Sequence, residues 1–501
     1  MDPKAGVQIS RKAFMQSLII LALLMLAAGV LTLVIEPGAY DRTLVDGRDV
    51  IDPNSYHTVA RPAYPAWRWL LAPLEVLGGP DGVTIITIVL FILMVGMAIA
   101  LLEKSGILNA LLGRIVRRFQ HRKMLLLMVI SFFFMCIGAF FGIFEEVVPL
   151  IPVVIGLAYA LGWDTLTGLG MSILATNMGF SAAVTNPFSI GLAQKIGGLP
   201  LFSGAEYRVA VFLVMYLVLI LFLTRYARQV ERSPESSPMF TEDQVNRRKF
   251  SSFETAGSEN PGMQRGMLFF AASLVLILAV FLSAPFVPLI SAISLPLVGL
   301  LFLIAGIGAS LLSGNAGRQA FNHALEGAAG LAPGIPLILM AASVKYIIAQ
   351  GSIMDTILHS AAAAFNSASP VAAAGEAAAP MLTMVSGASP FLAALLVYAI
   401  ALLIEFFVGS SSAKVFLLMP ILLPLGDLVG LTRQTAITAY CFGDGFTNLI
   451  YPTNAVLLIS LGLSSVPYGR WLKWTLKLWA WVLPLTLVFL LIAVFLRLGP
   501  F

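Results

Sequence analysis

The chain has 501 residues, of which 59% are hydrophobic and 11% are charged. This composition, with a mean hydropathy of +0.93, excludes a soluble globular protein and predicts a polytopic α-helical membrane protein. The net charge of +5 comes from basic clusters beside apolar runs, a distribution that is typical of membrane topology and argues against nucleic-acid binding.

Helical spans are predicted near 14–35 and 83–102, because each apolar run can cross about 30 Å of hydrocarbon as a helix. The first run is too long for a signal peptide and no small-residue cleavage site follows it, so we expect it to be retained. The placement of Lys and Arg predicts a cytoplasmic N-terminus in the cell (inner) membrane. The sequence ILNALLGRIVRRF (107–119) then predicts a basic amphipathic helix at the membrane surface.

A re-entrant hairpin that enters from the cytoplasmic side is predicted next, at 124–162. Two apolar arms of about sixteen residues flank the polar tip GIFEE (142–146). A charged turn at membrane depth requires cover by protein, so the arms should not be independent spans. An interrupted helix at 165–190 and a span at 207–226 complete a first repeat with its scaffold helices, which we assign to residues 1–230.

A hydrophilic stretch at 231–264 is the expected cytoplasmic linker between two halves of the chain. An extra span at 266–285 reverses the orientation of the second repeat, residues 265–501. The hairpin of this repeat, 390–427, should therefore enter from the external side. Its interrupted helix, 434–463, contains the polar sequence CFGDGFTNLIYPTN, which is poorly suited to lipid.

The two halves resemble each other in sequence. EEVVPLIPVVIGLAYALG (145–162) aligns with AKVFLLMPILLPLGDLVG (413–430), and MGFSAAVTN (178–186) aligns with DGFTNLIYPTN (444–454) after insertion of two residues. Inverted repeats with broken helices are typical of secondary transporters, whose substrate binds near the middle of the membrane. We therefore expect an all-α membrane protein with an inverted structural repeat, two re-entrant hairpins and two interrupted transmembrane helices.

Polar residues at the hairpin tips and helix breaks are expected to converge on one substrate site, because free backbone groups at helix breaks bind ions and glycine permits the turns. The candidate substrate-binding residues are Glu145, Glu146, Thr185, Asn186, Ser410, Ser411, Ser412, Lys414, Asp444, Thr447, Asn448, Thr453 and Asn454. The carbonyl groups of the two Thr-Asn pairs are also candidate Na⁺ ligands. No other metal site and no organic cofactor are expected.

The charges of these candidates favour a cationic substrate. Three acidic residues and one lysine give a net negative pocket, and ionisable groups at membrane depth are usually functional. A dicarboxylate would meet one lysine and much repulsion. A basic amino acid could place its carboxylate near Lys414 and the serines, and its cationic group near Asp444 and the glutamates.

Other roles stay open for some of these residues. Glu146 and Lys414 occupy equivalent repeat positions and could pair as a structural bridge. Asp444 could bind a proton or Na⁺ instead of substrate, and Ser410–Ser412 could form only a tight turn. Residues elsewhere are expected to be structural: Glu405 and Lys345 should snorkel or pair near helix ends, Cys136 and Cys441 should pack, and the alanine-rich patch 361–379 should be an external loop.

An enzyme is not expected. Ser411 and Lys414 fit the S-x-x-K motif, but the companion S-D-N and K-T-G motifs are absent from the sequence. The histidines show no H-E-x-x-H pattern and fall at His57, His121, His323 and His359. A channel is the stronger rival to a carrier, because the same polar breaks could line a continuous pore.

The motifs GDGFTNLIYPTN, GSSSAK with MPILLPLGDLVGLTRQTA, and FEEVVPLIPV resemble the YfcC family over about 80–475 of the chain. That family is related to the C4-dicarboxylate uptake C type carriers and to arginine/ornithine antiporters of the ion-transporter superfamily. The resemblance implies a scaffold, a moving transport domain and an elevator mechanism. It also implies a basic amino acid exchanger, or alternatively a carboxylate carrier coupled to Na⁺ or H⁺. Expected partners are a small charged metabolite, membrane lipids and a second copy in a homodimer.

Overall fold

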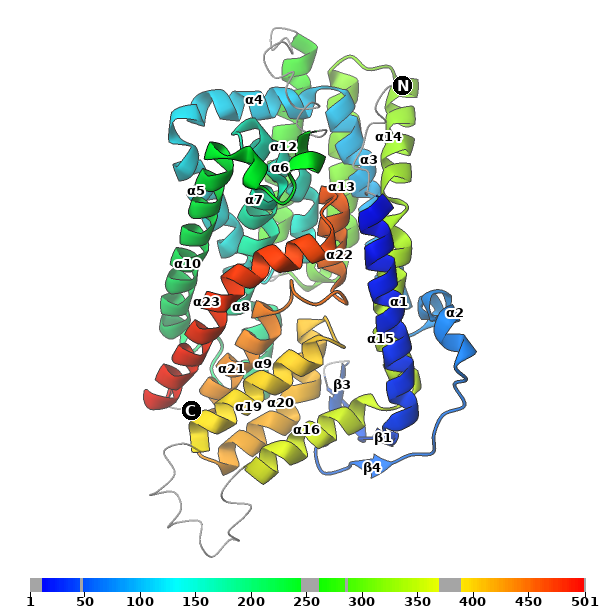
Figure 1. Ribbon diagram of the computed structural model, residues 1–501, viewed down its shortest axis with the longest axis vertical. Helices are drawn as coiled ribbons and strands as arrows, with labels where there is room; N and C mark the ends of the chain where they lie inside the picture. Colours follow the sequence, from blue (N-terminus) through cyan, green and yellow to red (C-terminus); the bar gives the residue numbers. More distant parts are fainter. Residues whose placement is uncertain (1–10, 46–47, 245–260, 284–286, 369–388, 500–501) are drawn as a thin grey trace, which may run out of the picture.

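The computed structural model describes residues 11–45, 48–244, 261–283, 287–368 and 389–499 and is built mostly of α-helices (Figure 1). Within these residues, seven helices are long and apolar enough to cross a membrane. A further pair of helices, α14 (Gly317–Leu331) and α15 (Gly334–Gln350), meets at an angle of 40° and forms either a broken eighth span or a re-entrant loop. The predicted polytopic α-helical membrane protein is confirmed.

The first half follows the predicted order of helices. The interrupted helix also contains π-helical turns at Gly170–Leu174 and Pro187–Gly191. In chain order the described α-helices are α1 (Arg11–Val34), α2 (Trp67–Glu75), α3 (Gly82–Lys104), α4 (Ile107–Phe119), α5 (Lys123–Cys136), α6 (Ile151–Ala160), α7 (Thr165–Leu169), α8 (Ala175–Ala182), α9 (Leu192–Ile196) and α10 (Ala205–Arg232).

The second half begins with the predicted extra span. Its described α-helices, besides α14 and α15, are α12 (Pro261–Ser283), α13 (Pro288–Leu312), α16 (Met354–Ala368), α19 (Ser389–Glu405), α20 (Ser411–Leu428), α21 (Arg433–Phe446), α22 (Ala455–Ser464) and α23 (Tyr468–Phe495). The loop predicted at 361–379 is partly wrong, because α16 continues to Ala368. Alanine is the strongest helix former, which explains the difference. Residues 369–379 lie outside the described part of the chain.

Two small antiparallel strand pairs, which the sequence did not predict, lie between α1 and α2. β1 (Gly38–Ala39) pairs with β4 (His57–Thr58), and β2 (Arg42–Val45) pairs with β3 (Arg48–Ile51). The guanidinium group of Arg42 binds both carboxylate oxygens of Asp355 on α16, at 2.7 and 2.8 Å. Both bonds come from the Nη2 atom of Arg42, and the resulting ion pair joins β2 to the amphipathic helix α16.

The two hairpins approach the centre of the molecule from opposite ends. Figure 1 shows α4 across one end and α16 across the other. The returning arm α6 packs against α4, while both arms of the second hairpin, α19 and α20, pack against α16. This placement is the one expected if the halves have opposite orientations. The inverted repeat and the re-entrant path stay predictions.

One arm of each hairpin is long enough to be a span of its own. A π-helical turn, Ile137–Phe141, extends α5, so that the arm Lys123–Phe141 has 19 residues, and α20 has 18. Both arms are long and apolar enough to cross a membrane by composition alone. The turn after the first arm begins at Gly142, whose positive φ of 66° favours glycine.

The core is formed where the two interrupted helices meet. Helix α8 packs against both α21 and α5. A Cβ atom at Gly179 would collide with the backbone carbonyl of Met135, and one at Gly445 would collide with Ser181. These glycines therefore allow α8 to pack closely against both α5 and α21, with the helix backbones nearly in contact.

Candidate functional site

The first helix break lies between α8 and the turn Pro187–Gly191, as predicted for the first Thr-Asn pair. The hydroxyl of Thr185 donates to the carbonyl of Phe140 in the first hairpin, at 3.0 Å. The side-chain oxygen of Asn186 accepts from two backbone N–H groups of the following turn, at 2.9 and 3.3 Å. The threonine thus joins the break to the hairpin, and the asparagine caps the next helical segment.

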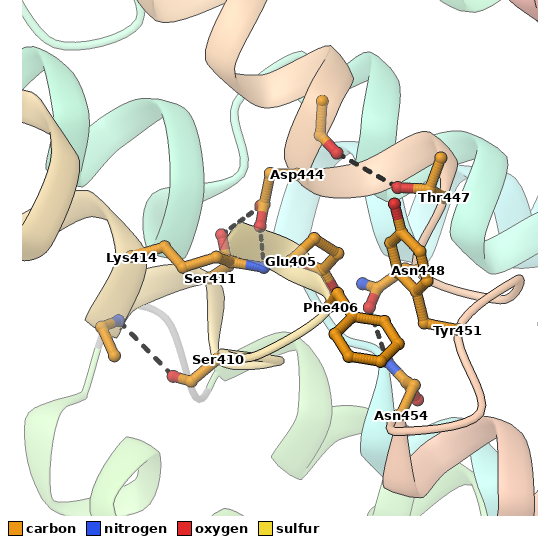
Figure 2. Close-up of polar contacts among 12 residues, drawn as sticks. Glu405, Phe406, Ser410, Ser411, Lys414, Asp444, Thr447, Asn448, Tyr451 and Asn454 are labelled. Carbon is orange, nitrogen blue, oxygen red and sulfur yellow. Dashed lines mark hydrogen bonds and ion pairs between the residues drawn. The ribbon is translucent and has the colours of Figure 1, made fainter. Parts of the chain in front are cut away.

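The second break repeats this arrangement between α21 and α22, about halfway along the long axis (Figure 1). Thr453 donates to the carbonyl of Phe406 in the second hairpin at 2.8 Å, and Asn454 caps α22 by accepting from Leu457 N at 2.9 Å. The amide of Asn454 also donates to the side chain of Asn448 at 2.5 Å (Figure 2). Equivalent bonds at both Thr-Asn pairs explain why a membrane-embedded segment contains such polar residues.

Removing either threonine hydroxyl should destabilise the break that it anchors. We expect Thr185→Val and Thr453→Val each to lower the free energy of unfolding by about 1 kcal/mol, because each leaves a hairpin carbonyl without its donor. Thermal unfolding in detergent measures the effect. Thr→Ser at the same positions keeps the hydroxyl and is the matched control. Valine variants as stable as the serine variants would contradict this structural role.

The tips of the two hairpins line one cavity of about 180 Å³. Its polar lining consists of Glu145, Glu146, Ser294, Ser410, Ser411, Ser412 and Asn448. The carboxylate of Glu146 accepts a hydrogen bond from Ser294 on α13 at 3.0 Å. The structure therefore brings together both predicted tips and one residue of the second break. Proximity of Glu145 and Ser411 was predicted, whereas nothing in the sequence marked Ser294.

A second cavity of about 260 Å³ adjoins the first and shares Glu145 and Ser410 with it. Thr453 and Asn454 line it together with residues of α3 and α15. The lining also contains an ion pair between Lys345 and Asp81, with 2.6 Å between Nζ and Oδ2. The predicted pairing of Lys345 is confirmed.

The lining of the two cavities has an excess of negative charge. Among the described residues, the carboxylates of Glu145, Glu146 and Asp81 and the ammonium group of Lys345 line them, which gives a formal charge of −2. Because Asp81 and Lys345 neutralise each other, the excess belongs to the two glutamates at the first tip. A cation is the natural counter-charge for such a site.

A buried triad of charged residues lies behind the second tip. The Nζ atom of Lys414 lies 2.5 Å from Oδ1 of Asp444 and also forms an ion pair with Glu405. The hydroxyl of Ser411 donates to the other oxygen of Asp444 at 2.5 Å (Figure 2). All three charged residues are at most 2% exposed, and they are not among the residues that line the two cavities.

This triad changes several sequence-based interpretations. Glu405 was expected to snorkel or pair near a helix end, and the pairing is confirmed: Glu405 ends α19 and is buried against Lys414. The alternative bridge between Lys414 and Glu146 does not form, because the partners are Glu405 and Asp444. Lys414, which the S-x-x-K interpretation would require as a base, instead forms ion pairs with two carboxylates. Substrate contact by Asp444 stays a prediction.

The remaining candidates lie apart from the cavities. Thr447 donates to the carbonyl of Gly443 within its own helix at 3.3 Å. Thr185 and Asn186 serve the first break and do not line either cavity. The part of the chain that the structure describes contains no group of three or more His, Cys, Asp or Glu residues that could hold a metal ion.

Known proteins resemble this chain over most of its length. Residues 14–495 match the family model DcuC, C4-dicarboxylate anaerobic carrier. The chain is 27% identical to the Escherichia coli (strain K12) protein named "Putative basic amino acid antiporter YfcC", over 92% of this chain and 93% of that protein. It is 26% identical to an uncharacterized protein of Haemophilus influenzae, over 78% of this chain and 72% of that protein.

Two solved structures also align with it. One is Neisseria gonorrhoeae MtrF, described with a class of antimetabolite efflux pumps, at 21% identity and a TM-score of 0.42, with 97% of this chain and 96% of that chain covered. The other is the Alcanivorax borkumensis YdaH transporter, at 19% identity and a TM-score of 0.39, with 97% of this chain and 100% of that chain covered.

Proposed function

Because the chain belongs to the DcuC family of C4-dicarboxylate anaerobic carriers, a family of membrane transporters, we propose that it is a secondary active transporter whose substrate is a basic amino acid. The observation that carries the choice of substrate is the excess negative charge of Glu145 and Glu146 in the cavity between the hairpin tips. The name of the Escherichia coli relative, a basic amino acid antiporter, agrees with it.

The substrate would lie between the two tips. Its guanidinium or ammonium group would bind Glu145 and Glu146. Its α-carboxylate would bind the hydroxyls of Ser410 and Ser412 and the N-terminus of α20, where Ser410 is the cap and backbone N–H groups attract anions. Asn448 would supply a further polar contact at the second break. In this proposal Asp444 acts on the site through Ser411.

Transport would follow an elevator mechanism in which the hairpins and broken helices move against a scaffold. The proposed scaffold contains α3 packed against α13 and α14, and α1 packed against α15. The proposed moving part contains α19 packed against α21, and α8 packed against α5, α10 and α21. The larger cavity supports this division, because residues of α3 and α15 and residues of the hairpin tips line it together. A cytoplasmic N-terminus remains part of the proposal.

A C4-dicarboxylate carrier coupled to Na⁺ or H⁺ is the second candidate. The description of the family favours it, and Lys345 offers one cation in the larger cavity. The backbone carbonyls at the two Thr-Asn breaks are the proposed ligands if Na⁺ is the coupling ion. Transport that does not depend on Na⁺ would remove this role and leave the breaks intact.

Ligand-induced stabilisation distinguishes the two candidates. We expect arginine or ornithine to raise the thermal unfolding temperature of the purified protein, because a ligand at about 100 times its Kd adds about 2.7 kcal/mol to the stability of the folded state. Succinate and fumarate at the same concentrations and ionic strength should not. Stabilisation by the dicarboxylates alone would contradict a basic amino acid as substrate.

A further inference from the structure

The buried triad of Glu405, Lys414 and Asp444 is not electrically balanced. With all three groups ionised it carries one excess negative charge, although the side chains are at most 2% exposed. An uncompensated charge is strongly unfavourable in such surroundings, and uptake of one proton removes it. Loss of the lysine proton would increase the imbalance, so the proton belongs on a carboxylate.

The helices that carry the triad favour the same protonation. Glu405 is the last residue of α19, and Asp444 lies in the last turn of α21. Both carboxylates therefore sit at helix C-termini, where the helix dipole disfavours negative charge. Neither carboxylate gains support for its ionised form from its own helix.

Among the described residues, the triad forms ion pairs only within itself. On α21, the hydroxyl of Tyr440 donates to the carbonyl of Ser411 at 2.9 Å, and the thiol of Cys441 is close enough to Asp444 to interact with it electrostatically. Helix α8 has no ionisable residue. Other ionisable residues of the helices packed around the triad are Tyr398 on α19, Asp427 on α20, Arg433 on α21, the exposed Lys195 on α9, and Tyr468, Arg470, Lys473 and Lys477 on α23. On α16, Asp355 and His359 contact Arg42 and Tyr40. Arg208 on α10 lies near Cys441, but its guanidinium group donates to the backbone carbonyls of Val184, Phe202 and Ser203.

We propose that this triad binds one proton and that the protein exchanges this proton for its cationic substrate. The inference rests on the proposed transport of a basic amino acid. Ser411 lines the substrate cavity and donates to Asp444, so one side chain separates the two sites. A cation in the cavity and a proton on the triad add positive charge to the same poorly solvated region, so each weakens binding of the other. When the substrate binds, the proton leaves Glu405 or Asp444 for water on the open side.

The direct test measures proton release when arginine binds to the purified full-length protein in weakly buffered solution with a pH indicator. We expect about one proton per bound arginine, and an apparent arginine affinity that falls as the pH is lowered. In Glu405→Gln the triad keeps a balanced Lys414–Asp444 pair, so this variant should bind arginine and release no proton. If Glu405→Gln does not fold, Asp444→Asn is the alternative variant. It leaves a balanced Lys414–Glu405 pair, so the same result is expected.

The released proton could instead come from the glutamates of the cavity, and Glu145→Gln is the control for that source. At saturating arginine it should release as many protons per bound arginine as the wild type. Binding without proton release in the wild type would overturn the proposal. So would release that persists in Glu405→Gln and disappears in Glu145→Gln.

If the protein does not bind arginine, the proposed function is contradicted. Proton binding by the triad can then still be tested without a ligand. In acid–base titration of the unliganded proteins down to about pH 6, where an ordinary glutamate is still ionised, we expect the wild type to take up one more proton than Glu405→Gln. Equal uptake would overturn proton binding by the triad.

Discussion

Replacing both Glu145 and Glu146 with glutamine should lower the affinity for arginine at least a hundredfold. Each carboxylate close to a cation contributes about 4 kcal/mol of attraction at an effective dielectric constant of 20, before desolvation reduces it, so a loss of at least tenfold for each is expected. Glutamine keeps the shape and the hydrogen-bonding capacity of glutamate. The loss should therefore come from the negative charge that the two residues bring to the cavity between the tips.

Titration calorimetry with arginine on the wild type and the double variant measures this effect. Asp427→Asn is a matched control: it removes a carboxylate that pairs with Arg433 outside the two cavities. An exposed pair of this kind contributes little, so arginine affinity should stay the same. An unchanged affinity in the Glu145/Glu146 double variant would show that the cationic group binds elsewhere.

Replacing Lys414 with methionine should be the most damaging single change to stability. It leaves Glu405 and Asp444 buried without their shared cation, and removal of one partner from a buried ion pair lowers stability by about 3–5 kcal/mol. Thermal unfolding in detergent should show a large decrease in midpoint or a loss of folded protein.

Neutralising the whole triad should restore much of that stability. We expect the triple variant Lys414→Met, Glu405→Gln, Asp444→Asn to unfold at a higher temperature than Lys414→Met alone, because no unpaired charge remains buried. If Lys414→Met is as stable as the wild type, the lysine does not hold the two carboxylates together as the structure shows.

Local patterns in the sequence predicted most of the helices. Apolar runs defined the spans, and the basic stripe of ILNALLGRIVRRF correctly placed α4. The non-helical breaks at Thr185–Asn186 and Thr453–Asn454 were also predicted correctly, because glycine, proline and asparagine act through nearby backbone. The resemblance to the YfcC family is confirmed by the relative and family matches.

Pairing between distant residues was beyond a single sequence. The position of Glu405 in a buried triad depends on how α19, α20 and α21 pack, and its partners Lys414 and Asp444 are 9 and 39 residues away in the chain. The Thr-Asn pairs show a second difficulty. The same polar residues that mark a binding site also cap helices and anchor hairpins, and only their contacts reveal the structural role.

Counterflow of labelled arginine in proteoliposomes tests the central proposal most directly. With unlabelled arginine or ornithine inside the vesicles, we expect saturable uptake of external labelled arginine. Uptake should be much smaller when succinate replaces the internal amino acid, because only proton exchange then balances it. Counterflow of labelled succinate with no counterflow of arginine would contradict the account and favour a dicarboxylate carrier. Arginine flux that neither saturates nor responds to internal arginine would contradict a carrier and favour a channel.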